Sequence, residues 1–138
     1  MTQEQKELLL KDLCARLPYG VKGQYLNSND PLLKAVPISY GSLSKADGMV
    51  MDGSLVPWLF PLSSMTDELW DKEFTGCGIT EFTRDSFKYG CETLEFNNSN
   101  PHLSNMVKFI NQLIKNHFDI YDLIPKGLAN DATGKNIY

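Results

Sequence analysis

The stretch that most constrains this chain runs from Asn100 to Phe118 and has the pattern of an amphipathic helix. Its apolar residues recur at three- and four-residue steps, which places them on one side of a helix: Leu103, Met106, Val107, Ile110, Leu113 and Ile114. Asn100 suits the N-cap, and Pro101 suits the first helical position, where its missing N–H costs no hydrogen bond. We therefore predict a helix over residues 101–117, with the rest of the chain packed against its apolar side.

Two more helices are indicated by their starting residues. Thr2 followed by Gln5 has the form of a capping box, which predicts a helix over residues 2–16. Cys14 lies in the apolar stripe of that helix, so we expect it to be a small buried hydrophobe. A polar run before residue 67 can cap a short helix over residues 67–74, whose first turn is acidic and therefore favourable for the helix dipole.

The remaining segments favour short strands. Residues 21–60 contain short apolar runs broken by turn dipeptides, which is typical of an antiparallel meander. Pro37 cannot donate a ladder hydrogen bond, so its strand is predicted at an edge or a bulge. For the same reason Pro57 argues against a central strand in the apolar segment 55–62. Alternation within residues 87–96 predicts one or two further strands.

Together these elements predict one α+β domain over residues 1–138. In this fold a small antiparallel sheet packs against the N-terminal helix and the long amphipathic helix near the C-terminus. With 138 residues the chain can bury a sizeable core.

Composition and charge narrow the class of protein. The chain is 42% hydrophobic and 22% charged, as in ordinary globular proteins, and its formal net charge is −4. The sequence has no Lys/Arg cluster, which disfavours binding to nucleic acid or to an anionic membrane. It also lacks an apolar run of the roughly 20 residues that cross a bilayer. A charged N-terminus without a signal-peptide pattern and an odd number of cysteines, three, favour the cytoplasm.

Several short motifs occur together along the chain. They are LPYGVK at residues 17–22, PLSSMT at 61–66, NHFD at 116–119, and GLA and DAT at 127–133. In this combination the chain resembles a family of small uncharacterised proteins found in gut Bacteroidales genomes, their phages and mobile elements. The resemblance implies a bacterial or phage cytoplasmic setting. It brings no activity, cofactor or partner.

Metal and thiol chemistry have little support in the spacing of the residues. A structural zinc site needs close pairs of ligands, whereas Cys77, Cys91, His102 and His117 are scattered. We therefore expect neither a metal nor a cofactor. Cys77 could act as a nucleophile with His102 or His117 as its base, but it follows a predicted helix C-terminus, whose negative end opposes thiolate formation.

An acid–base site is the other chemical hypothesis. His117 could work with Asp119 or with Asp131, because a carboxylate can orient a histidine for proton transfer. The structural alternative places His117 near a helix C-terminus, where the dipole favours it, and uses Asp119 to turn the chain. We favour the structural role.

The aromatic residues suggest a binding surface. Trp58, Phe60 and Trp70 are predicted to contact a partner if they are exposed, since tryptophan is typical of interface hot spots. The favoured function is a non-catalytic protein–protein interaction module that binds a partner or self-associates. The alternative is a small hydrolase or transferase that uses the His117 site or Cys77. A third hypothesis is a nucleic-acid-associated factor with a basic surface, formed by Lys108, Lys115 and Lys126.

Overall fold

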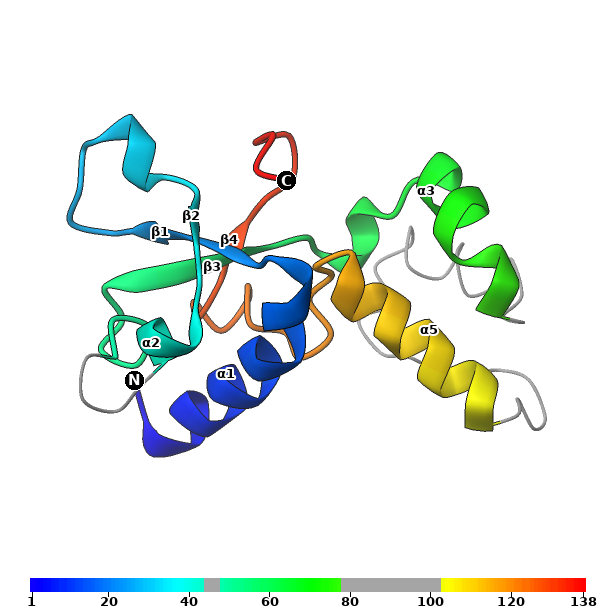
Figure 1. Ribbon diagram of the computed structural model, residues 1–138, viewed down its shortest axis with the longest axis horizontal. Coiled ribbons are helices and arrows are strands. Elements are labelled where there is room, and N and C mark those ends of the chain that lie inside the picture. The colour runs from blue at the N-terminus through cyan, green and yellow to red at the C-terminus, as the bar shows by residue number, and fades with distance from the viewer. Residues whose placement is uncertain (44–47, 78–102) are drawn as a thin grey trace.

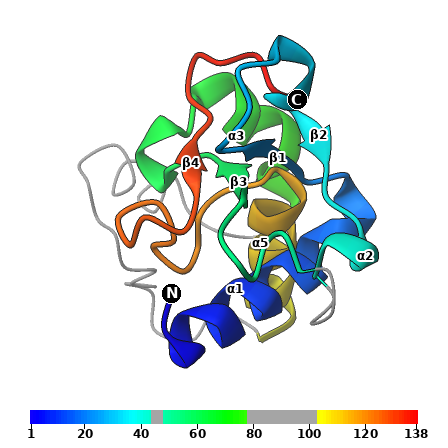
Figure 2. The same cartoon turned by 90° about the vertical axis from the view of Figure 1, so that its left-hand side faces the viewer.

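Helix α1 (Gln3–Arg16) lies on one side of a small mixed sheet, and the C-terminal end of the chain lies on the other side (Figure 1). The computed structural model describes residues 1–43, 48–77 and 103–138. Helices α3 (Asp67–Glu73) and α5 (Leu103–Lys115) pack together at one end of the sheet. In the view turned by 90°, α1 again lies below the strands (Figure 2). The predicted α+β class is confirmed.

Helix α1 (Gln3–Arg16) begins as the capping box predicts. The Thr2 hydroxyl accepts a hydrogen bond from the Gln5 N–H at 3.2 Å, and the Gln5 side chain accepts one from the Thr2 N–H at 2.8 Å. The prediction for Cys14 is wrong, because Cys14 is exposed. The helix buries Leu9, Asp12, Leu13 and Arg16, so its buried side includes two charged residues that the apolar pattern does not reveal.

The sheet has the order β2-β1-β3-β4. Its strands are β1 (Lys22–Tyr25), β2 (Val36–Pro37), β3 (Leu55–Leu59) and β4 (Asn130–Asp131). The first three pair antiparallel as predicted, but β3 and β4 pair in parallel, so the prediction of a purely antiparallel sheet is wrong. The chain reaches β4 only after α5, and such a long connection is what a parallel pair requires.

Pro57 lies within β3, a central strand, contrary to the prediction from its missing N–H. The register explains why this proline is tolerated. The Leu26 N–H donates to the Ser54 carbonyl at 3.0 Å, so hydrogen-bonded pairs recur every second residue from there. Pro57 faces Gly23 and falls between two bonded pairs, where β1 needs no N–H from it. Pro37 lies in β2, which is an edge of the described sheet, as predicted.

Two clusters of buried apolar side chains form the core. The first joins α1 to the inner side of the sheet, through residues such as Leu9, Leu13, Leu55 and Leu59. The second is rich in aromatic rings and joins α3 (Asp67–Glu73) to α5 (Leu103–Lys115). Short 3₁₀ turns and one short helix complete the described elements: η1 (Leu17–Tyr19), η2 (Pro31–Leu33), α2 (Tyr40–Leu43), η3 (Leu62–Ser64) and η4 (Thr75–Cys77).

Both predicted internal helices are present with small changes of length. Helix α3 is capped by Thr66, whose hydroxyl accepts from the Leu69 N–H, and it has two acidic residues in its first turn. Helix α5 corresponds to the helix predicted over residues 101–117. Its predicted cap at Asn100, the adjacent Pro101 and the strands predicted within residues 87–96 lie outside the described residues.

A buried ion pair joins the C-terminal ends of α1 and α5, which meet in Figure 1. The Arg16 guanidinium donates to both carboxylate oxygens of Asp12 at 2.7 Å. It also donates to the carbonyls of Phe118 at 2.6 Å and Ile114 at 3.4 Å. A cation is favourable at this position because two helices end there, and the C-terminal end of a helix dipole is negative. Burial raises the pKa of Asp12, and Arg16 opposes that rise.

Candidate functional site

The side of the sheet that faces away from α1 is the outer face. It is formed by residues that alternate with the buried ones along the strands, and their register places them together: Lys22, Gln24, Pro37, Val56, Trp58 and Asn130. Within β3 the burial alternates, with Leu55, Pro57 and Leu59 buried and the intervening residues half-buried. The outer face is therefore an accessible surface with a tryptophan near its centre.

Trp58 and Phe60 lie on this side of the sheet, and both remain half-buried. The Trp58 indole N–H donates to the Lys34 carbonyl at 2.7 Å, which orients its ring over the neighbouring strands. Phe60 follows β3, and its ring lies 6.1 Å from that of Phe118. Both side chains are therefore partly accessible, although Phe60 also packs against the aromatic cluster of α3 and α5.

Trp70, which is predicted to contact a partner if it is exposed, is buried, so it does not meet this condition. Trp70 is only 2% exposed and stacks on Phe74, with ring centroids 5.4 Å apart. It also contacts the edge of Phe109 at 6.0 Å. Because α3 and α5 pack through these rings, Trp70 belongs to the core.

Tyr138 brings the last segment of the sequence back to the outer face. Its hydroxyl donates to the Trp58 carbonyl at 2.6 Å and accepts from the Lys22 N–H at 3.3 Å. The Lys22 ammonium donates to the Ile137 carbonyl at 2.7 Å and lies 5.8 Å from the centre of the Tyr138 ring. Burial of the hydroxyl raises the pKa of Tyr138 to about 12, although the residue as a whole is 41% exposed.

His117 ends helix α5 in a left-handed conformation, with φ of 61°. Its N–H donates to the Ile114 carbonyl at 3.0 Å, and the Phe118 N–H donates to the Leu113 carbonyl at 2.9 Å. This pair of bonds is a Schellman motif, in which glycine usually takes the position of His117. The histidine side chain therefore has a role that offsets the conformational cost.

That role is packing beneath Tyr138. The two rings are stacked, with centroids 3.9 Å apart and an interplanar angle of 12°. Burial and, to a smaller extent, the neighbouring charge of Arg16 lower the pKa of His117 to about 4, so the imidazole is neutral near pH 7. Its Nδ1 atom is buried and has no hydrogen-bond partner among the described residues.

The two carboxylates proposed to assist His117 are engaged elsewhere. Asp119 is buried and accepts hydrogen bonds from the backbone N–H groups of Leu123 at 2.9 Å and Ile124 at 2.8 Å. Asp131 is exposed on β4 and accepts from the Thr133 N–H at 2.8 Å. Neither carboxylate forms a hydrogen bond to His117 within the described parts of the chain. The structure instead brings His117 together with Tyr138 and Arg16.

Cys77 is buried in the aromatic cluster of α3 and α5. Burial raises the pKa of its thiol, so the reactive thiolate is disfavoured. Of the other scattered zinc candidates, Cys91 and His102 lie outside the described residues. Within residues 1–43, 48–77 and 103–138 no group of three or more His, Cys, Asp or Glu side chains could hold a metal ion.

The predicted basic surface is partly neutralised by neighbouring carboxylates. The Lys115 ammonium lies 3.7 Å from a Glu73 carboxylate oxygen, and the Lys126 ammonium lies 3.8 Å from that of Asp122. Lys108 is exposed on α5. These pairs reduce the positive charge that phosphate binding would require.

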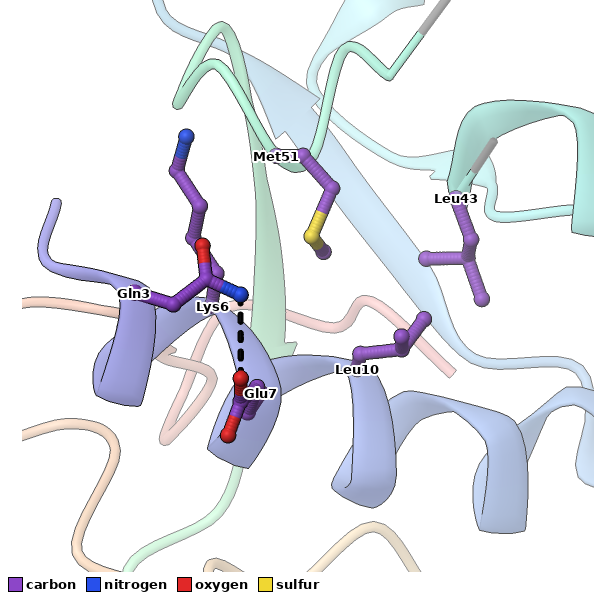
Figure 3. A pocket seen from close by; sticks show the side chains of 6 residues that line it. All are labelled: Gln3, Lys6, Glu7, Leu10, Leu43 and Met51. Carbon is purple, nitrogen blue, oxygen red and sulfur yellow. Dashed lines mark hydrogen bonds between the residues drawn. The ribbon is translucent and has the colours of Figure 1, made fainter. Parts of the chain in front are cut away.

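A separate hollow of about 390 Å³ lies between the start of α1 and the segment that leads to β3 (Figure 3). Gln3, Lys6, Glu7 and Leu10 of α1 line one side of the hollow, and Leu43 and Met51 line the other. The Gln3 amide donates to the Glu7 carboxylate at 3.0 Å. The lining contains none of the predicted site residues.

Sequence reasoning missed the residues that organise the site, namely Arg16, Lys22 and Tyr138. Asp12 and Arg16 are four residues apart on a helix, a spacing that permits an ion pair but is usual on exposed faces. The position of Tyr138 has no local signal, since its contacts are with residues 80 and 116 positions away in the sequence.

Among the described residues no helix has the length and apolar character needed to cross a membrane. Comparison with known proteins finds no family model, no curated protein and no solved structure that matches this chain.

Proposed function

We propose that the protein is a non-catalytic protein–protein interaction module whose contact surface is the outer face of the sheet. The observation that carries this proposal is the position of Trp58, which is half-buried on a face that α1 does not cover. Phe60 and Tyr138 extend the aromatic surface around it, with their ring centroids 5.8 Å apart. Partly exposed tryptophan and tyrosine side chains supply much of the binding energy in protein interfaces.

The hydrolase or transferase alternative has less support. The neutral His117 ring is stacked on Tyr138, and the Asp119 carboxylate accepts hydrogen bonds from backbone N–H groups. Cys77 is packed among aromatic rings. A general base needs access to the proton that it removes, whereas the His117 ring is stacked on Tyr138, and its buried Nδ1 has no orienting partner among the described residues. The structural contacts of each residue account for its position without invoking a reaction.

The proposed setting is the cytoplasm of a bacterium, with the gene carried by the bacterium or by a phage or mobile element. Supporting this setting are the sequence resemblance and the free thiols of Cys14 and Cys77. The nucleic-acid hypothesis is weaker than the interaction hypothesis because the net charge is −4 and two of its three lysines face carboxylates.

Site-specific photo-crosslinking tests the proposed surface. A photoreactive phenylalanine analogue replaces Gln24 on the outer face, and in a second protein it replaces Val107, which is 51% exposed on α5. Both proteins are irradiated in nuclease-treated lysate of the source cells. We expect one discrete adduct from position 24 and none from position 107.

Two matched substitutions show whether the adduct depends on the outer face. Val56→Lys introduces a charge opposite Gln24, whereas Val107→Lys introduces the same charge on α5. The first should reduce the yield of adduct at least tenfold, and the second should leave it unchanged. Equal yields from the two variants, or equal labelling from positions 24 and 107, would refute the assignment of this surface.

A further inference from the structure

The Tyr138 hydroxyl lies inside the hydrogen-bond ladder of β1 and β3. The register pairs Gly23 with Pro57 and Gln24 with Val56, so Lys22 is opposite Trp58. Bonded pairs recur every second residue from Leu26 and Ser54, which makes Lys22 and Trp58 the next such pair after Gln24 and Val56. Here the hydroxyl takes the place of the direct bond from the Lys22 N–H to the Trp58 carbonyl, because it accepts from the former and donates to the latter.

The surroundings of the hydroxyl and its ring form a slot, defined by His117, Phe60, Lys22 and the Trp58 carbonyl. His117 stacks on one face of the tyrosine ring, and Phe60 lies tilted by 48° beside it. The Lys22 ammonium is within the range of a cation–π contact. One donor and one acceptor are aimed at the hydroxyl. This combination selects a phenol, since phenylalanine lacks the hydroxyl that both backbone groups need.

The segment that leads to Tyr138 runs along the surface of the protein. Residues 133–136 are exposed, and Asn136 has a left-handed backbone with φ of 52°. Tyr138 itself remains 41% exposed. Another tyrosine could form the same stacking and the same two hydrogen bonds, so the slot does not require its occupant to come from this segment.

We propose that the slot is a tyrosine-recognition site, which a partner protein enters with an exposed tyrosine that displaces Tyr138. The inference rests on the proposed function, which it deepens by naming the chemistry of the partner. Tyr138 competes as an intramolecular ligand at a high effective concentration. Release of Tyr138 uncovers the ring of His117, on which the incoming tyrosine would then stack.

The test uses the full chain carrying Tyr138→Gly, with N-acetyl-tyrosinamide as probe and N-acetyl-phenylalaninamide as its control. Binding is followed by the NMR signals of the His117 imidazole and the Trp58 indole. For a ligand of this size we expect a Kd of about 1 mM for the tyrosine probe. The phenylalanine probe should bind about tenfold more weakly, because it leaves a donor and an acceptor unpaired. The wild-type chain should bind the tyrosine probe at least tenfold more weakly than the variant.

A second variant protects the test against misfolding of Tyr138→Gly. Tyr138→Phe keeps the stacked ring and loses both hydrogen bonds, so the tyrosine probe should bind it more tightly than it binds the wild-type chain. Equal affinities for the two probes, or NMR shifts that do not include the His117 signals, would overturn the assignment of the slot as a tyrosine-recognition site. A wild-type dimer that sedimentation shows to be lost in Tyr138→Gly would make a second copy the occupant and overturn the assignment to a partner.

The outcome also separates this inference from the proposed function. If position 24 gives an adduct but the two probes bind equally, the tyrosine-recognition site is refuted and the proposed interaction surface is retained. If the probes are discriminated but position 24 gives no adduct, the slot is supported as a binding site and the proposed interaction surface is refuted.

Discussion

Replacing Arg16 with methionine should strongly destabilise the fold, because the guanidinium is fully buried and has several acceptors. The substitution keeps a similar side-chain length and leaves the Asp12 carboxylate buried without its cation. Breaking one half of a buried ion pair costs about 3–5 kcal/mol. The Phe118 carbonyl also loses a 2.6 Å hydrogen bond, which adds about 1 kcal/mol or more if no water replaces it. We therefore expect Arg16→Met to reduce the free energy of unfolding by about 4 kcal/mol.

The double variant Asp12→Leu/Arg16→Met tests the reasoning behind this figure. With both charges removed, the carboxylate desolvation no longer contributes, and the remaining loss comes from the Phe118 carbonyl that Arg16 no longer reaches, about 1–2 kcal/mol. The double variant should thus be more stable than Arg16→Met by about 2 kcal/mol. Urea unfolding followed by tryptophan fluorescence gives each free energy by linear extrapolation, and Trp70 in the aromatic cluster is a suitable reporter.

The matched control is the exposed pair of Asp122 and Lys126, which has the same order and the same four-residue spacing. Lys126→Met should cost no more than about 1 kcal/mol, since water solvates the carboxylate that remains. A cost for Arg16→Met below about 1 kcal/mol would refute the argument from burial. So would a double variant that is less stable than Arg16→Met.

Three further predictions follow from residues described above. His117 has a pKa of about 4 in the folded protein and 6.5 in the unfolded chain, so its contribution to stability is complete above pH 6.5. The free energy of unfolding, measured by urea unfolding, should fall by about 3 kcal/mol as the pH falls from 6.5 to about 4. His117→Asn, in which asparagine tolerates the left-handed backbone, should not show this fall. Phe74→Ala, in the aromatic cluster, should cost about 3–5 kcal/mol, measured by the same unfolding assay, and a cost below about 1 kcal/mol would contradict the packing described. Gly23→Ala should destabilise the protein by about 1–3 kcal/mol, because the added Cβ would lie 3.0 Å from the Val56 carbonyl oxygen. Gly76→Ala is the control, and with open space around it this change should alter stability by less than about 0.5 kcal/mol. Similar effects of the two alanines would count against the close approach of β1 and β3.

The helix starts could be predicted because their signals are local. The Thr2 capping box and the Thr66 cap involve residues three apart, so the chain needs no tertiary information to specify them. The amphipathic pattern of α5 is similarly readable, since its apolar stripe repeats over several turns. Agreement between sequence and structure is best at these elements.

The central position of β3 was mispredicted because the cost of a proline depends on register. Opposite Gly23, Pro57 removes no hydrogen bond between β1 and β3. A proline at the next position of β3 would remove one. Register is set by which strands meet, which is information that a local pattern does not contain. The parallel pairing of β4 has the same cause, as it follows from the return of the chain after α5.

The candidate site was predicted only in part. Trp58 and Trp70 look equivalent as sequence features, yet one lies on the outer face and the other is 2% exposed. The difference arises because α3 and α5 bury Trp70 between them, whereas no described helix covers the outer face. Arg16 could not be identified because a charged residue on a helix is usually solvated, and only the meeting of two helix ends gives it buried acceptors.

The contacts of Arg16 also have a kinetic consequence. Its hydrogen bonds to Ile114 and Phe118 join residues 98 and 102 positions apart in the sequence. Bringing such distant segments together has an entropy cost that is recovered only after most of the chain is ordered. We therefore expect these bonds to form after the folding transition state, so that Arg16→Met raises the unfolding rate and changes the folding rate little. Arg16 would then act mainly to keep the folded protein from opening.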